Sequence, residues 1–212
     1  MNAAIALVAV LAVGCVAKPV VDEGPAQAEL APMARPTVAL NQRTVELDLV
    51  KGEEIYYDIT EINDDGTHAG LNSSGCSWQS LSEFVAPALM WNDCSDDTEW
   101  KSGENKNMQV EGALWPLAVG NKASYSYDQH NALGEMTGRK TRKCTVEGVV
   151  NIEVQGEQLD TYKVVCKRVQ PGWWQTNVTY FSPQKGRSVK WLQTQKNDGL
   201  VHDRELLRIE QL

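Results

Sequence analysis

Basic residues are in short supply in this chain of 212 residues, which has 20 lysines and arginines against 28 aspartates and glutamates. The formal net charge of −8 repels phosphate backbones, and this excludes nucleic acid as an expected partner. The longest basic cluster, GRKTRK at 138–143, lies between strand-like segments. Because lysine and arginine on an edge strand deter edge-to-edge pairing, we interpret the cluster as a solvated hairpin edge.

Catalytic and metal-binding motifs are also missing. The sequence contains no HExxH motif, no Walker loop and no GxSxG elbow, which are the signatures of several enzyme classes. Its three histidines (His68, His130 and His202) stand in polar or turn-like settings, and its cysteines have no CxxC spacing. We therefore expect no catalytic residue, no metal site and no cofactor, and we predict that the protein is not an enzyme.

The chain has no apolar run of the roughly 20 residues that a membrane-spanning helix needs. Residues 1–14 are uncharged and mostly Ala, Val, Leu and Ile, which suits the apolar core of a secretory signal peptide. Such a signal normally begins with a lysine or arginine, and none precedes the apolar core here. The true start therefore lies upstream, or the amino terminus alone supplies the positive charge.

The signal ends at Leu11-Ala12-Val13-Gly14-Cys15, which resembles the lipobox of bacterial lipoproteins. The resemblance implies cleavage before Cys15 and acylation of its thiol, and more than one acyl chain gives lasting membrane anchoring. Lipoproteins retained in the inner membrane carry an aspartate after the cysteine, whereas this chain has Val16. The resemblance thus implies the outer membrane of a two-membrane bacterium. The alternative is a plain secretory signal in which Cys15 is incidental.

Residues 15–42 contain four of the eight prolines and no steady periodicity. Such proline spacing disfavours both helix and sheet, so we predict a partly extended tether behind the lipidated cysteine. The predicted organisation is therefore a signal peptide at 1–14, a tether at 15–42 and one β-rich periplasmic domain at 43–212.

The domain at 43–212 consists of alternating strand-like segments separated by turn signals, such as Asp65-Gly66, every 10 to 15 residues or so. This rhythm predicts a mainly β fold: an antiparallel meander forming a curved sheet, a half-barrel or a sandwich. At most one short helix is expected. Its best candidate is residues 80–91, although Pro87 lies within that segment and disfavours a helix.

Four of the five cysteines lie in this domain (Cys76, Cys94, Cys144 and Cys166). An exported protein meets an oxidising environment, in which such cysteines pair. Three pairings are open, and we favour Cys76–Cys94 and Cys144–Cys166 because each closes a short loop between neighbouring segments. The odd cysteine, Cys15, is then the one at the predicted lipidation site.

Seven tryptophans stand against only two phenylalanines. Trp78, Trp91, Trp115 and Trp191 lie in apolar or strand contexts and are expected in the core. Trp173 and Trp174 follow a turn, and one of two neighbours in a strand must point outward. This pair is our candidate ligand contact.

Three segments of the body, GALWPLAVGNKASYSYD (112–128), GEQLDTYKVVC (156–166) and TYFSPQKGRSVKW (179–191), resemble an uncharacterised bacterial envelope β-domain. That domain is similar to the half-barrel of periplasmic lipoprotein carriers, so the resemblance implies a curved sheet able to hold acyl chains or a peptide. It implies no catalytic residue.

Together these observations predict a lipid-anchored cell-envelope protein with a non-enzymatic binding or assembly role at the outer membrane, facing the periplasm or the cell surface. Its predicted partners are the membrane, through the lipid anchor, and an envelope protein, an apolar ligand or a glycan. One alternative is a half-barrel carrier or sensor of an apolar ligand. Another is a module that binds glycan or peptidoglycan through Trp173 and Trp174.

Overall fold

The computed structural model describes residues 21–212, so the predicted signal peptide, Cys15 and the start of the predicted tether lie outside the described residues. The described part is all β, with no helix. Its strands are β1 (Gly24–Pro25), β2 (Gln42–Asp48), β3 (Glu53–Ile62), β4 (Thr67–Asn72), β5 (Ser77–Leu81), β6 (Ala88–Asn92), β7 (Gly103–Ala113), β8 (Lys122–His130), β9 (Met136–Val154), β10 (Glu157–Gln170), β11 (Trp173–Ser182), β12 (Arg187–Gln195) and β13 (Gly199–Gln211).

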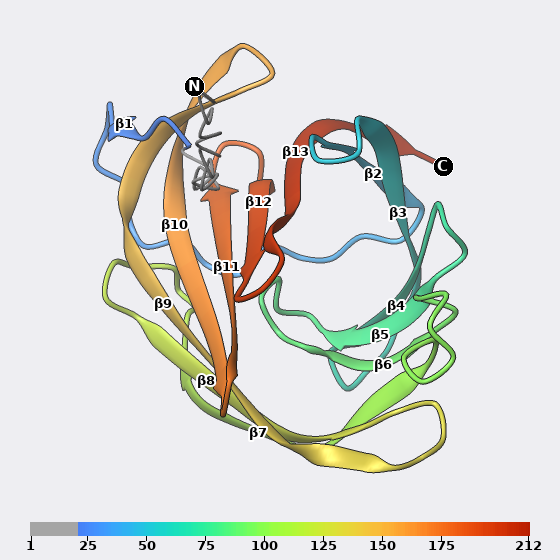
Figure 1. Cartoon of the computed structure of the whole chain (residues 1–212). Coiled ribbons are helices and arrows are strands. Elements are labelled where there is room, and N and C mark those ends of the chain that lie inside the picture. Colours follow the sequence, from blue (N-terminus) through green and yellow to red (C-terminus); the bar gives the residue numbers. More distant parts are fainter. Residues whose placement is uncertain (1–20) are drawn as a thin grey trace, which may run out of the picture.

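The strands form a closed antiparallel barrel (Figure 1). From β2 to β13 each strand pairs with the next along the chain, and β13 returns to pair with β2. The predicted antiparallel meander is therefore confirmed. The predicted half-barrel or sandwich is wrong, because the sheet has no open side between β2 and β13. Alternation of polar and apolar residues shows which face a side chain takes, but it does not record whether the two ends of a sheet meet.

Strand β9 is long and pairs with three other strands. Its first part pairs with β8, and its pairing with β10 extends from Arg142 to Val154. The pairing with β8 stops at Thr145, and beyond it β1 pairs with the same side of β9, opposite Val150 and Asn151. Residues 138–143 pair with β8 along their whole length, and β10 pairs with the other side only from Arg142 onward, so residues 138–141 form a hairpin edge as predicted. Lys140 is buried and Lys143 is exposed, as alternation along one strand requires.

The segment predicted as a helix, residues 80–91, instead forms the end of β5, a turn and β6. Pro87 lies in this connection, where its missing amide hydrogen is no loss. The connection is nonetheless part of the interior, because Val85 is 5% exposed and belongs to the main core cluster. The Val85 carbonyl also accepts a hydrogen bond from Arg142 Nη1 at 3.0 Å.

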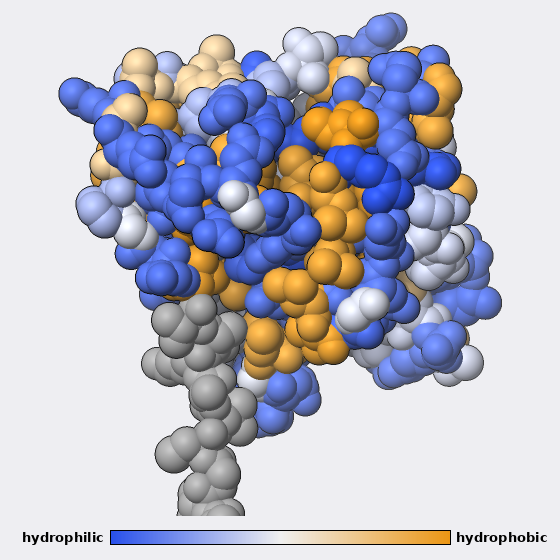
Figure 2. Space-filling view, turned by 90° about the horizontal axis from the view of Figure 1, so that it is seen from above, coloured by the Kyte–Doolittle hydropathy of each residue, from blue (hydrophilic) through white to orange (hydrophobic). Residues whose placement is uncertain are grey.

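The main core cluster lies around β8, β9 and β10. Phe181 from β11 and Leu117 from the β7–β8 connection complete it. A second cluster includes Ile152, Leu159 and Leu192, from β9, β10 and β12. On the face seen from above, Figure 2 shows apolar residues gathered in a band with polar residues around it.

The residues between β1 and β2, which we call the crossing segment (residues 26–41), run behind the barrel in Figure 1 from one side to the other. Tyr162 Oη donates to the carbonyl of Ala31 at 2.8 Å, and Met33 and Leu117 exchange two backbone hydrogen bonds. The predicted tether, over its described part, therefore contacts the barrel along its length. The division of the whole chain into three regions stays a prediction.

Two disulfides link neighbouring parts of the sheet. Cys144 and Cys166 lie directly opposite each other on β9 and β10 and are both buried. Cys76, before β5, is joined to Cys94, after β6. These are the two pairings that the sequence favours.

A substitution of Leu117 tests whether the β7–β8 connection contributes to stability, since the Leu117 side chain is fully buried. We expect Leu117→Ala to lower the free energy of unfolding by about 2–5 kcal/mol, through lost burial and the cavity left behind. Leu133→Ala is the matched control because Leu133 is 72% exposed, and it should change this free energy by less than about 0.5 kcal/mol. Urea unfolding with intact disulfides measures both; equal losses would contradict the assignment.

Candidate functional site

A cavity of about 250 Å³ lies at one end of the barrel interior. The crossing segment covers it with residues 35–39, and β2, β4 and the turn before β12 form its sides. Because side chains two apart on a strand share a face, Thr44 and Glu46 of β2 both line the cavity. The cavity is therefore assembled from segments far apart in the sequence.

One wall of the cavity is aromatic. Phe84 from the β5–β6 connection packs against both Trp115 and Phe181, with ring centroids 5.7 and 5.0 Å apart. Trp115 and Phe181 meet edge to face at 5.4 Å. Such mutual contacts fix the three rings in place, and Ile59 extends the same apolar surface.

The opposite wall is polar and centred on Arg187. Its Nη1 donates to Thr44 Oγ1 at 2.7 Å and its Nη2 to the side-chain oxygen of Gln42. Burial lowers the pKa of Arg187 and raises the pKa of Glu46, which shares the cavity. The wall thus holds a guanidinium fixed by two neutral acceptors and a carboxyl group that burial shifts toward its protonated form.

Three residues that line this cavity each have a buried polar atom with no hydrogen-bond partner: His68 Nδ1, Trp115 Nε1 and Arg187 Nε. Leaving such an atom unpaired costs about 1–3 kcal/mol. Two of them, Trp115 Nε1 and Arg187 Nε, carry hydrogen and can only donate. The residues around the cavity therefore include unused donors beside an aromatic wall, which suits a small molecule with a hydrogen-bond acceptor and an apolar part.

A second group of interior charges, between β2 and β13, is by contrast paired. Asp48 is fully buried and accepts hydrogen bonds from the backbone of Val50 and Lys51 and from Arg204 Nε. Burial opposes ionisation of Asp48, but these hydrogen bonds outweigh it and lower the pKa of the carboxyl. Arg204 also donates to Tyr57 Oη. Because these groups satisfy one another's hydrogen bonds, we infer that their role is to stabilise the pairing of β2 with β13.

The residues predicted as a ligand contact, Trp173 and Trp174, lie at the start of β11 and do not line this cavity. Trp173 has the guanidinium of Arg168 over its ring at 4.6 Å, whereas Trp174 is 40% exposed. Cys15 lies outside the described residues. Within residues 21–212, no group of three or more His, Cys, Asp or Glu could hold a metal ion, and no helix could cross a membrane.

Sequence reasoning missed Glu46, His68 and Arg187 as cavity residues. Each stands in an ordinary strand or turn context, and only the closure of the sheet brings them to Trp115. Trp115 itself lies in the WPL stretch that carries the family resemblance, but it was expected in the core. It packs against the core and also lines the cavity, and its indole nitrogen is buried without a partner.

No protein-family model matches the chain, and no curated protein matches it. Among solved structures, the "hypothetical lipoprotein YmcC" from Escherichia coli matches with a TM-score of 0.46 and 10% identity, over 82% of this chain and 90% of that one. A "putative exported protein with YmcC-like fold" from Bacteroides fragilis matches with a TM-score of 0.39 and 11% identity, over 85% and 100%. At these values the likeness carries no conclusion about function.

His202, beside the paired interior charges, makes stability depend on pH. Its ring stacks on Trp191 at 5.1 Å, and burial together with nearby Arg204 lowers its pKa to about 4. An unfolded histidine has a pKa of about 6.5, so the folded protein binds fewer protons than the unfolded chain between these values. The stabilisation is therefore complete above pH 6.5 and is lost as the pH falls toward 4.

We expect His202→Gln to lose less unfolding free energy than the wild type between pH 7 and pH 4.5, as measured by urea unfolding at both pH values. Carboxylates other than Asp48, which lies 3.8 Å from His202 Nδ1, contribute equally to both proteins and cancel in the comparison. Identical pH dependence in the wild type and His202→Gln would refute the assignment.

Proposed function

We propose that the protein is a lipid-anchored, non-enzymatic protein of the cell envelope whose barrel binds a small amphiphilic molecule in the cavity beneath the crossing segment. The anchor is Cys15, and the absence of an aspartate at position 16 favours the outer membrane. The observation that carries the binding function is the set of unpaired buried atoms of His68, Trp115 and Arg187 around one cavity.

The size of the cavity limits the ligand. An apolar cavity of about 150 Å³ accommodates benzene, so about 250 Å³ suits a molecule, or the part of a molecule, of about ten non-hydrogen atoms. This is less than a long acyl chain needs. The proposal therefore narrows the predicted carrier of an apolar ligand to a binder of a short amphiphile.

The polar wall sets the sign of the ligand's head group. Arg35 and Glu83, which also line the cavity, pair with each other at 3.8 Å, and burial raises the pKa of Glu46. Arg187 is then the unbalanced charge, so a carboxylate is favoured over an ammonium group. Its apolar part would contact Phe84, Phe181 and Ile59. Octanoate has both features at this size and is a suitable probe.

We expect octanoate to bind the wild-type protein in calorimetric titration, and octylamine, of the same length and opposite charge, to bind at least about tenfold more weakly. Arg187→Gln removes the charge and Trp115→Phe removes one donor while keeping the aromatic wall. Each should weaken octanoate binding about tenfold, since hydrogen bonds to charged groups contribute about 1.5–3 kcal/mol.

The matched control is Arg208→Gln on β13, because Arg208 is surface-exposed and pairs with Glu54 outside the cavity. It should leave octanoate binding unchanged. Circular dichroism establishes that each variant is folded. Equal affinities for octanoate and octylamine, or an unchanged affinity in both cavity variants, would contradict the binding function.

The anchor has its own test. Cells grown with radiolabelled palmitate should incorporate label into the wild-type protein, and Cys15→Ser should lose all of it, because only the cysteine thiol can take the diacylglyceryl group. The protein should also move from the membrane fraction to the soluble fraction in this variant. A wild-type protein without label would rule out the anchor while leaving the cavity proposal standing.

A further inference from the structure

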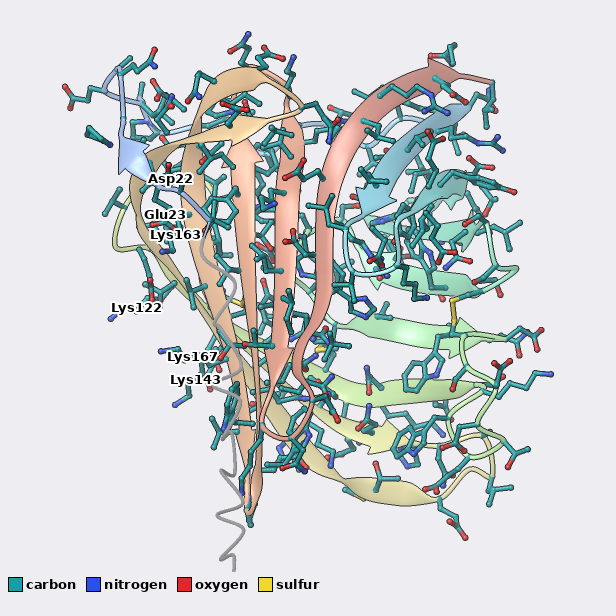
Figure 3. All side chains as sticks on the ribbon, turned by 45° about the horizontal axis from the view of Figure 1, so that its top comes forward. Asp22, Glu23, Lys122, Lys143, Lys163 and Lys167 are labelled. Atoms are coloured by element: carbon teal, nitrogen blue, oxygen red, sulfur yellow. A yellow bond between two sulfur atoms is a disulfide. The ribbon has the colours of Figure 1, made fainter. Side chains whose placement is uncertain are left out.

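Lysines gather on the outer face of β8, β9 and β10, where Figure 3 shows Lys122, Lys143 and Lys167 on one side of the barrel with Lys163 above them. Lys143 and Lys167 are exposed and lie directly opposite each other across β9 and β10. Like charges in such a position destabilise a sheet. Lys122, Lys143 and Lys167 form no ion pair with any part of the chain that the structure describes. This arrangement leaves three basic side chains open to a negatively charged partner outside the described chain.

A shallow groove of about 530 Å³ runs between these lysines. Lys143 and Lys167 line it together with Val165 and Val169, and Glu147 is the acidic side chain in its lining. We call the surface formed by this groove, Lys122 and Lys163 the lysine face.

Exposed apolar side chains border the lysine face. Val169 is 70% exposed and lies directly opposite Trp174 on β11. Val169 lies two residues after Lys167, and Trp174 lies two residues before Thr176, the partner of Lys167. Both side chains therefore point outward, as Lys167 does. Basic side chains beside an exposed tryptophan and a valine form the combination that binds at a membrane surface, where the head groups are charged and the layer beneath is apolar.

The described chain begins against the same side of the barrel. Glu23 forms an ion pair with Lys163 at 2.7 Å and accepts a hydrogen bond from Tyr180 Oη at 2.5 Å. Val21 packs against the second core cluster. Cys15 is six residues before Val21, and six residues span at most about 20 Å. An acyl group on Cys15 therefore enters the membrane within about 20 Å of this side.

We propose that the lysine face lies against anionic lipid head groups, with Lys122, Lys143 and Lys167 contacting their phosphates and Trp174 and Val169 at the interface. This inference depends on the proposed anchor at Cys15. The net charge of −8 does not oppose it, because salt screens charges beyond about 8 Å and the nearest charges then dominate. The apposed lysines lose their mutual repulsion when phosphate lies between them.

The test is amine-reactive footprinting of the acylated full-length protein on vesicles. One set of vesicles contains only phosphatidylcholine, and the other contains phosphatidylcholine with phosphatidylglycerol. We expect the labelling rates of Lys122, Lys143 and Lys167 to fall about fivefold on the anionic vesicles. This is the factor that corresponds to the binding free energy of about 1 kcal/mol that a lysine gains near an anionic membrane surface. Lys51 and Lys101, exposed in other strand connections, are internal controls whose rates should not change.

A charge-reversed protein, Lys143→Glu with Lys167→Glu, should no longer show protection of Lys122, while the control protein, Lys51→Glu with Lys101→Glu, should keep it. Equal labelling on both kinds of vesicle, or protection of Lys122 that survives the reversal at 143 and 167, overturns the proposal and directs the search to a protein partner for this face. Flotation with neutral vesicles reports the anchor separately, because it requires the acyl group but not the lysines.

Discussion

The antiparallel pairing of β2 with β13, from Gln42 opposite Gln211 to Asp48 opposite Arg204, turns a long meander into a closed surface. Without it, β2 and β13 would be the two free ends of one curved sheet, and Asp48 would not be enclosed. With it, one face of every strand lies inside a barrel and must be filled or paired. The aromatic core, the charges around Asp48 and the cavity around Arg187 all depend on that enclosure.

The mainly β class and the antiparallel meander could be read from the sequence, because turn residues such as Asp65-Gly66 punctuate alternating segments. The failure at residues 80–91 has a local cause, since an apolar run containing Pro87 looks like a weak helix but fills the barrel end as a turn. Closure could not be predicted, because it depends on the pairing of β2 with β13, the first and last strands of the domain, and no local pattern marks that pairing.

The residues that line the cavity could not be predicted from the sequence either, because barrel closure brings them together. Glu46, His68 and Arg187 come from three strands or turns without a shared motif, and their proximity is set by register across the barrel. Trp115 was identifiable as a structured position but not as a donor without a partner. The tryptophan pair at 173 and 174 was predicted as an exposed contact, and only Trp174 has that exposure, because the Trp173 ring lies against Arg168.

The pairing of β2 with β13, in which Gln42 lies opposite Gln211 and Asp48 opposite Arg204, joins the beginning of the domain to its last residues. A chain that emerges from its amino end first cannot complete this barrel until its final strand has arrived. Contacts of such large sequence separation form late, because a long loop must close before they contribute. Until then β2 and β12 are unpaired edges of the partly folded meander. The carboxyl-terminal strand β13 pairs with both of them and so removes both edges in one step.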